Sequence, residues 1–414
     1  MKILFSNEVA NTPKKRKNNI LKLKVLKTIF ENRTIAINEI AAKVNLSLPT
    51  LNLIVNELIN EGLLEQKDKG DSIGGRKPNL YQVKNQTLNV LSIEIDRFNI
   101  RIVVIDNNNS IVHKSRKYQH QLSKEAIDIQ NVVDLIYRYA SEENIDWTKI
   151  TVMGILMPGL INAETGENLT YYQGAGFNLQ KHLEKIFRKD VYLLNDVKSA
   201  ALSELKYGAA IGQRNVLIIQ MDWGIGLGII INGEVYMGNE GFSGEVGHMM
   251  FAEDGQLCYC GKRGCLETVA SGIALVNTAK RDILAAKPTL LSSKYDVDNL
   301  LPTDIIEAAN LGDQYAIDLI NTLGSNLGKA FSQLIQLFNP QRIVISGKFV
   351  EAGSLITLPI QLTIETYTMN ALKKNCTLHL STLGENGAVK GIILYSINKY
   401  FDDLIRKMEH EPLH

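Results

Sequence analysis

The stretch GFSGEVGHMMFAEDGQLCYCGKRGCLETVAS, residues 241–271, holds three of the four cysteines of this 414-residue chain. Cys258, Cys260 and Cys265 follow His248 with the spacing H-x9-C-x-C-x4-C. Three thiolates and one imidazole form a closed tetrahedral donor set, which suits structural Zn²⁺. The alternative is a group of buried cysteines without a ligand. The spacing favours one structural zinc ion per chain, bound by these four residues.

The composition is that of a soluble globular protein. Hydrophobic residues make up 45% of the chain and charged residues 21%, and 414 residues are enough for two or three domains. No apolar run is long enough to span a membrane, and the start MKILF is too short for a signal-peptide core. We therefore expect a cytoplasmic protein without a membrane partner, in a reducing compartment where clustered cysteines bind metals.

The net charge of +1 conceals an asymmetry along the chain. Residues 1–84 contain fifteen Lys or Arg and eight Asp or Glu, a net charge of +7, so that the remainder carries −6. A small basic head on a mildly acidic body suggests that the head binds a polyanion. A solvated basic tail is the alternative that composition alone leaves open.

The basic head has the pattern of a winged helix-turn-helix. Residues 14–32 place apolar side chains at helical spacing, and residues 37–66 predict two short helices separated by a turn at Asn45 and Leu46. Asn38 is expected to cap the first of these helices, and Ser47 the second. Residues 63–83 then predict a two-stranded wing.

The second short helix is the predicted recognition helix. Its apolar stripe leaves polar side chains to face outward, where they can reach base edges or phosphates. The wing loop adds two basic residues. The predicted DNA contacts are Ser47, Thr50, Asn52, Asn56, Arg76 and Lys77. A generic three-helix interaction domain is the alternative, and the wing and the charge asymmetry favour DNA.

The rest of the chain alternates predicted strands and helices. Strands are expected in 90–113, 150–159, 191–195, 214–238 and 339–346, with an amphipathic helix over 125–143 and another after Asp196. This alternation predicts an α/β architecture with much parallel pairing.

Residues 241–271 closely resemble the signature of the ROK family, which comprises sugar-responsive repressors and sugar kinases. MPGLI (157–161), NDVKSAALSE (195–204) and NPQRIVISG (339–347) follow in the family's order, so the resemblance covers nearly the whole chain. A leading winged helix-turn-helix that ends in GGRKP is typical of the repressor branch, as in the xylose and N-acetylglucosamine repressors.

The resemblance implies a two-lobed, actin-like ATPase (ribonuclease H-like) body behind the DNA-binding head. We expect the head in residues 1–84 and the first α/β lobe in 85–203, completed by 388–414. The second lobe, with the zinc loop, is expected in 204–387.

The resemblance also implies a sugar site. The family's sugar contacts fall on Gly159, Asn195, Asp196, Glu245, His248 and Glu267. Carboxylates and amides suit sugar hydroxyls, which both donate and accept hydrogen bonds. His248 is expected to bind zinc through one ring nitrogen and a sugar hydroxyl through the other, so that the metal fixes the imidazole's orientation. Taken singly, Glu245 or Glu267 would more often be a solvated surface acid.

Two glycine-rich turns of the family's kinases are altered in this chain. Phosphate-binding turns need glycines so that backbone amides can approach the ligand. Asp96, Arg97 and Phe98 replace the first turn, where Asp96 is expected to repel phosphate, and Asp222 and Trp223 precede Gly224 in the second. Asp196, the general base of the kinases, is present, but a base without a phosphate donor transfers nothing.

The sequence therefore predicts a regulator and not an enzyme. We expect a transcriptional regulator, most simply a repressor, that binds operator DNA as a homodimer or higher oligomer and responds to a small sugar or sugar phosphate. A ROK-type ATP-dependent sugar kinase with a fused DNA-binding head is the alternative. A DNA-binding scaffold with a vestigial pocket is a third hypothesis.

Overall fold

The computed structural model describes residues 12–67, 79–384 and 386–410. The chain groups into two compact units, one of Met1–Asn195 with Ile392–His414 and one of Asp196–Gly391. The three-part domain division expected from the sequence remains a prediction. None of the helices in the described residues is long and apolar enough to cross a membrane.

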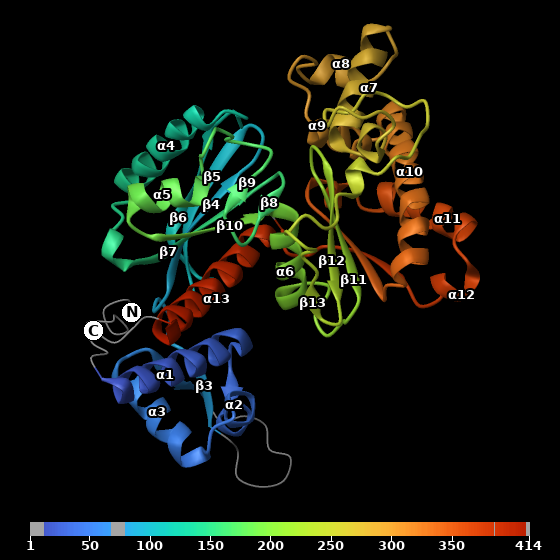
Figure 1. The fold of residues 1–414 in the computed structure, drawn as a ribbon. Helices are drawn as coiled ribbons and strands as arrows, with labels where there is room; N and C mark the ends of the chain where they lie inside the picture. Colours follow the sequence, from blue (N-terminus) through green and yellow to red (C-terminus); the bar gives the residue numbers. More distant parts are fainter. Residues whose placement is uncertain (1–11, 68–78, 385, 411–414) are drawn as a thin grey trace. The chain divides into compact units, whose positions relative to one another are not determined.

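The first unit begins with the predicted winged helix-turn-helix head (Figure 1). Three helices pack beside a small antiparallel sheet of order β1-β3-β2. The elements of the head are α1 (Pro13–Asn32), β1 (Ile35–Ala36), α2 (Ile37–Val44), α3 (Leu48–Asn60), β2 (Leu64–Lys67) and β3 (Leu80–Val83).

Local sequence explains most of the head's boundaries. Ser47 accepts a hydrogen bond from the Thr50 amide at the start of α3, and Asn45 ends α2 in the left-handed conformation, as expected. The prediction that Asn38 caps α2 is wrong, because the helix begins at Ile37 after Ala36, whose side chain makes no capping bond. Pairing of Ala36 with β3 fixes this helix start instead.

The remainder of the first unit is a five-stranded sheet of order β10-β7-β4-β5-β6. The strands β4, β5 and β6 are antiparallel neighbours, whereas β7 and β10 are added in parallel. The strands are β4 (Asn89–Ile95), β5 (Asn99–Asp106), β6 (Ile111–Gln119), β7 (Ile150–Met157) and β10 (Asp190–Asn195), with a small hairpin of β8 (Ile161–Asn162) and β9 (Glu167–Asn168).

Helices cover both faces of this sheet (Figure 1). The helices α4 (Ile129–Glu142) and α5 (Leu179–Phe187) share one apolar core with alternate residues of the strands. On the other face, the Tyr192 hydroxyl of β10 donates to Asp403 of α13 (Gly387–His410), at 2.9 Å. The helix expected over 125–143 starts later than predicted, after a short 3₁₀ turn at Ala126–Asp128.

The second unit repeats this topology. Its sheet has the order β13-β12-β11-β14-β15, with three antiparallel strands followed in sequence by two parallel ones. Two sheets of one topology are the arrangement expected of the actin-like, ribonuclease H-like body, so this prediction is confirmed. The strands are β11 (Val216–Met221), β12 (Ile225–Ile231), β13 (Glu234–Val235), β14 (Arg342–Ser346) and β15 (Thr377–Leu380).

The helices of the second unit form its main core on one face of the sheet. The long helix α10 and its neighbours bury their apolar faces against β11 and β12, while α6 (Asp196–Tyr207) packs on the opposite face through Ala201. The other helices are α7 (Gly272–Leu284), α8 (Leu291–Lys294), α9 (Pro302–Asn310), α10 (Gln314–Phe338), α11 (Ser354–Tyr367) and α12 (Asn370–Lys373).

The helix α13 begins in the second unit and continues into the first. Its first turn accepts hydrogen bonds from α6, because Ser199 donates to the Ala388 carbonyl and Ser203 to the Gly387 carbonyl, each at 2.5 Å. Its last turns contact the head, where Asp402 pairs with Lys27 at 2.5 Å. One helix therefore touches both α6 and the DNA-binding head.

Candidate functional site

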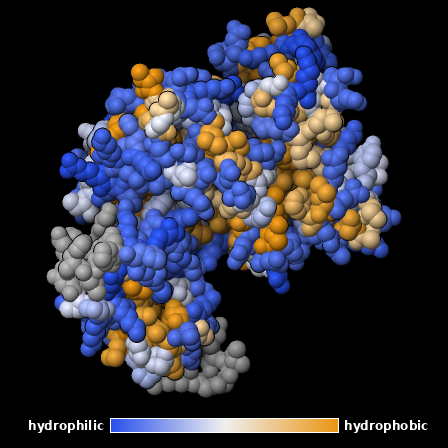
Figure 2. All heavy atoms as spheres, viewed as in Figure 1, coloured by the Kyte–Doolittle hydropathy of each residue, from blue (hydrophilic) through white to orange (hydrophobic). Residues whose placement is uncertain are grey.

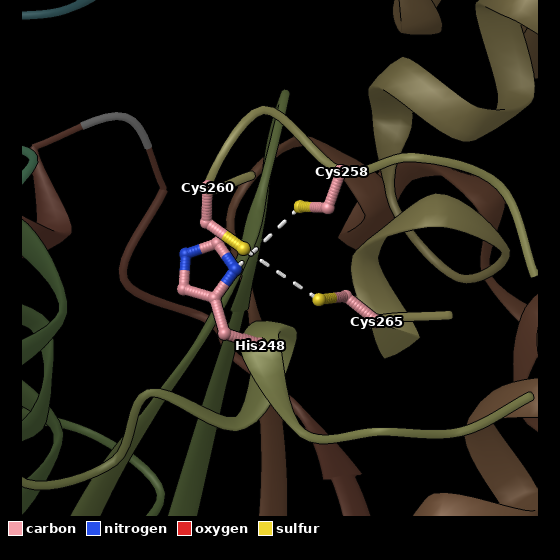
Figure 3. Close-up of side chains that lie close together, drawn as sticks. All are labelled: His248, Cys258, Cys260 and Cys265. Atoms are coloured by element: carbon pink, nitrogen blue, oxygen red, sulfur yellow. Dashed lines mark hydrogen bonds between the residues drawn. The ribbon is translucent and has the colours of Figure 1, made fainter. Parts of the chain in front are cut away.

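Four predicted metal ligands converge in the second unit (Figure 3). His248 ends a short 3₁₀ turn, and the three cysteines lie on the loop that follows. The ligand atoms of the four residues all lie within 4.8 Å of one another. The His248 Nδ1 atom is 3.7 Å from the Cys258 sulfur, and the sulfurs of Cys260 and Cys265 are also 3.7 Å apart.

Backbone hydrogen bonds shape this loop. The amides of Phe251 and Ala252 both donate to the Gly264 carbonyl, and the Cys258 amide donates to the Lys262 carbonyl. Gly264 has φ of +73°, and a side-chain carbon at this position would clash with the Ala252 carbonyl. Only glycine fits there. The chain therefore turns back on itself and presents the thiols to one point.

The donor chemistry fits a metal ion. Burial raises the pKa of Cys258 to about 12, so a thiolate at this position needs a nearby cation. A bound divalent metal supplies this charge and deprotonates its coordinating thiols. Lys262 and Arg263, both exposed, add positive charge next to the ligand loop.

A buried carboxylate lies against this cluster. Glu267 is only 4% exposed, on the 3₁₀ turn Leu266–Thr268 that directly follows Cys265. Its Oε2 atom is 3.8 Å from His248 Nδ1 and 3.9 Å from the Cys258 sulfur. Burial raises the pKa of Glu267 to about 7, although a hydrogen bond from the Ile225 amide opposes this change. The structure thus brings Glu267 and His248 together, as the sequence predicted.

Glu245 stands next to a lysine that the sequence analysis missed. The Glu245 residue is exposed, yet the protein atoms around its carboxylate reduce its solvation and raise its pKa. Lys198 on α6 is 2% exposed, and its Nζ atom donates to the Ser243 carbonyl at 2.6 Å and to the Ser243 hydroxyl. Burial lowers the pKa of Lys198 to about 8, and Glu245 opposes this change. Lys198 therefore ties the loop that carries Glu245 to α6.

The remaining predicted sugar contacts are divided between the two units. In the first unit, the Asn195 side chain donates to the Gly159 carbonyl at 3.1 Å. Gly159 has φ of +104°, and a side chain there would meet Asn168 and Thr170. In the second unit, Asp196 is the first residue of α6, and its carboxylate accepts from the Val197 amide.

Each altered glycine-rich turn carries an aspartate that accepts hydrogen bonds from backbone amides. In the first unit, Asp96 Oδ1 accepts from the amides of Phe98 and Asn99, each at 2.7 Å. In the second unit, Asp222 Oδ1 accepts from the Lys348 amide at 3.0 Å. The sequence suggested that Asp96 repels phosphate. The geometry adds that each carboxylate uses amide donors of its own.

The predicted recognition helix presents a polar face to solvent. Four of the six predicted DNA contacts, Ser47, Thr50, Asn52 and Asn56, are exposed on or beside α3. Leu51, Ile54 and Leu58 are buried beneath them, as predicted. Arg76 and Lys77 lie outside the described residues.

Tyr259 is a second polar contact that sequence reasoning missed. Its hydroxyl lies 3.2 Å from His248 Nε2, and the two rings meet edge to face with centroids 5.2 Å apart. The sequence position of Tyr259 could have indicated this contact. A residue between two ligands of one metal, here Cys258 and Cys260, is held close to the other ligands, which include His248.

Two sequence profiles match the chain. A profile of the ROK family covers residues 90–398, and a profile described as winged helix-turn-helix DNA-binding covers residues 18–65. The chain is 26% identical to the dual regulator NagC of Escherichia coli K12 over 86% of this chain and 87% of NagC. It is 28% identical to the xylose repressor of Caldicellulosiruptor bescii, over 92% and 96% of the two chains.

Solved structures agree with these matches. A ROK family transcriptional regulator, a homolog of the E. coli MLC protein, superposes with a TM-score of 0.77 at 27% identity, over 95% of this chain and 99% of that one. A ROK family glucokinase of Streptomyces griseus, in complex with glucose and AMPPNP, superposes with a TM-score of 0.65 at 26% identity, over 74% and 99%. The glucokinase therefore matches about three quarters of the chain, whereas the regulator matches nearly all of it.

Proposed function

The chain belongs to the ROK family, and we propose that it is a cytoplasmic, sugar-responsive transcriptional repressor. The observation that carries this proposal is the winged helix-turn-helix head, whose recognition helix exposes Ser47, Thr50, Asn52 and Asn56. Two relatives that match 86% and 92% of this chain are named N-acetylglucosamine repressor and xylose repressor.

We propose that each chain holds one structural Zn²⁺ on His248, Cys258, Cys260 and Cys265. Support comes from the convergence of the four ligand atoms and from their chemistry, three thiols and one imidazole. His248 Nδ1 faces the sulfurs, which leaves Nε2 for a polar partner. The metal would fix the orientation of this imidazole and the fold of the loop.

We propose that the sugar binds through Glu245, His248 and Glu267 of the second unit. The family resemblance adds Gly159, Asn195 and Asp196. Glu267 supports this proposal most strongly, because a buried carboxylate needs polar partners and sugar hydroxyls supply them.

The kinase alternative is disfavoured by the two aspartates. A kinase of this family would present backbone amides to the nucleotide phosphates, but Asp96 already accepts hydrogen bonds from amides of its own turn. Asp222 accepts one from the amide of Lys348, a residue that follows β14. A second anion beside either carboxylate would be repelled. We propose that the chain catalyses no phosphoryl transfer and that Asp196 serves as a sugar ligand.

The DNA complex is proposed to contain at least two chains. One recognition helix reads only a few base pairs, so operators of this type are palindromic and bind dimers. Exposed apolar residues on α11, Leu358 and Leu362, offer surface for association, and Figure 2 shows hydrophobic side chains on the visible face of the second unit. Arg76 and Lys77 are proposed to contact the minor groove beside the operator.

The helix α13 is proposed to link the sugar to the head. Its first turn rests on α6, whose first residue is the proposed sugar ligand Asp196. Its last turns contact α1 through Asp402, through Glu409, which pairs with Lys24 at 3.1 Å, and through Phe401, which packs on Phe30. If the sugar binds more tightly to the protein in one arrangement of these contacts, it would increase the population of that arrangement and so change how the head is held.

A thermal-shift panel of monosaccharides and sugar phosphates tests the proposed sugar site. A matching sugar at 100 times its Kd stabilises the folded protein by about 2.7 kcal/mol. Glu267→Ala should remove this stabilisation, while Glu253→Ala, an exposed acid of the same loop, should keep it. A panel without any stabilising sugar, or equal shifts in wild type and Glu267→Ala, would overturn the proposed site.

A further inference from the structure

An exposed tyrosine touches two of the polar groups of the proposed sugar site. Tyr259 is 61% exposed, although its ring lies edge to face against His248. Its hydroxyl is 3.2 Å from His248 Nε2 and also hydrogen-bonds the Glu267 carboxylate. One phenol therefore contacts the two side chains on which the sugar proposal chiefly depends.

The hydrogen-bonding roles of this phenol follow from the metal site. Because His248 Nδ1 faces the sulfurs, a metal held by the four ligands would bind this nitrogen and leave the ring proton on Nε2. His248 Nε2–H then donates to the Tyr259 oxygen. The Tyr259 proton is left to donate to Glu267, since a carboxylate only accepts. A sugar hydroxyl held by His248 and Glu267 would accept and donate in the same way.

We infer that Tyr259 occupies the place of a sugar hydroxyl in the ligand-free protein and swings out when the sugar binds. Tyr259 is then a specificity-determining residue, because a sugar must offer a hydroxyl that replaces the phenol at both partners. The inference rests on the proposed sugar site. It goes beyond that proposal, because it identifies the Tyr259 hydroxyl as a group of the chain itself that competes with the sugar for His248 and Glu267.

The surroundings of Tyr259 allow this movement. The metal would fix Cys258 and Cys260 on either side, so the backbone can stay in place while the side chain rotates about its own bonds. The exposed ring loses little buried apolar contact when it leaves. A tyrosine whose role was only to support the fold would be expected to bury its ring.

Calorimetric titration of the sugar found in the thermal-shift panel tests the inference. Tyr259→Phe keeps the ring but removes the competing hydroxyl, so sugar should bind roughly 3- to 10-fold more tightly, the effect of one modest net hydrogen bond. Leu257→Ala, which shortens an exposed side chain of the same loop, should bind as wild type does. Elemental analysis should find equal metal in all three proteins.

A spectroscopic measurement follows the phenol directly. In protein labelled with 3-fluorotyrosine, the ¹⁹F resonance that disappears in Tyr259→Phe reports this ring. Sugar should move that resonance toward the position of a solvent-exposed tyrosine, and a resonance that stays in place would contradict the inference.

The outcomes separate the two proposals. Equal or weaker sugar binding by Tyr259→Phe, with wild-type binding intact and lost in Glu267→Ala, overturns the inference alone. If neither wild type nor Tyr259→Phe binds any sugar of the panel, both the inference and the proposed sugar site fail.

Discussion

Replacing Cys260 with serine should release the metal and open the ligand loop. Cys260 is exposed, unlike Cys258 and Cys265, so the substitution disturbs no buried packing. The loop has one apolar anchor, Phe251, which packs against the core of the second unit, whereas Met250, Leu257 and Tyr259 are all exposed. Its order must therefore come mainly from its backbone hydrogen bonds and from the metal.

The size of the effect follows from the length of the loop. The proposed metal would join His248 to Cys265 across the 16 residues between them. A cross-link that closes a loop of this length is worth about 3 kcal/mol. Since 1.4 kcal/mol corresponds to a factor of ten, hydrogen exchange of the loop amides should accelerate roughly 100-fold.

Hydrogen exchange read by mass spectrometry, together with elemental analysis, measures this change. The affected amides should include those of Phe251, Ala252 and Gly264, which are hydrogen-bonded within the loop. Cys376→Ser, which changes the cysteine outside the loop, is the control and should keep both metal and protection. Slow exchange of the loop in a Cys260→Ser protein that holds no metal would refute the reasoning.

Three further predictions concern the stability of the head, the absence of catalysis and the link between the sugar site and the head. Ser47→Ala removes the cap of α3 and should destabilise the head by about 1 kcal/mol, seen as a lower denaturation midpoint. A coupled assay with ATP and several aldoses should detect no turnover, because Asp96 and Asp222 place carboxylates in the two turns and accept hydrogen bonds from backbone amides there and at Lys348, and turnover in the ordinary enzymatic range would contradict this. Asp402→Ala removes a partly exposed ion pair with Lys27 worth at most about 1 kcal/mol, so the sugar-induced change in operator affinity should shrink by no more than roughly fivefold, measured by fluorescence anisotropy.

Periodicity and capping predicted the local elements of this chain well. The buried stripe of α3 and its Ser47 cap follow from side-chain spacing and from the preference of serine for that position. The start of α2 did not follow, because pairing of Ala36 with β3 sets it and a distant strand leaves no mark on the local pattern. The repeat of one sheet topology in both units came from the family resemblance and not from periodicity.

Some residues of the candidate site could likewise be predicted from the sequence, and others could not. The four metal ligands could be predicted because their spacing is short and their chemistry narrow. The roles of Lys198 and Tyr259 could not be predicted, since they depend on which way each side chain points after folding. Asp96 was recognised as a charge that would repel phosphate, but only the geometry revealed that Asp96 and Asp222 each accept hydrogen bonds from backbone amides.

One titration tests most directly whether a sugar controls DNA binding by this chain. Fluorescently labelled operator, selected from genomic fragments by the protein itself, is bound to saturation, and the sugar found in the thermal-shift panel is added while anisotropy is followed. A coupling of about 1–3 kcal/mol predicts that saturating sugar weakens operator binding roughly 5- to 150-fold. Operator affinity that stays unchanged or increases at saturating sugar would contradict the account of a repressor released by its sugar.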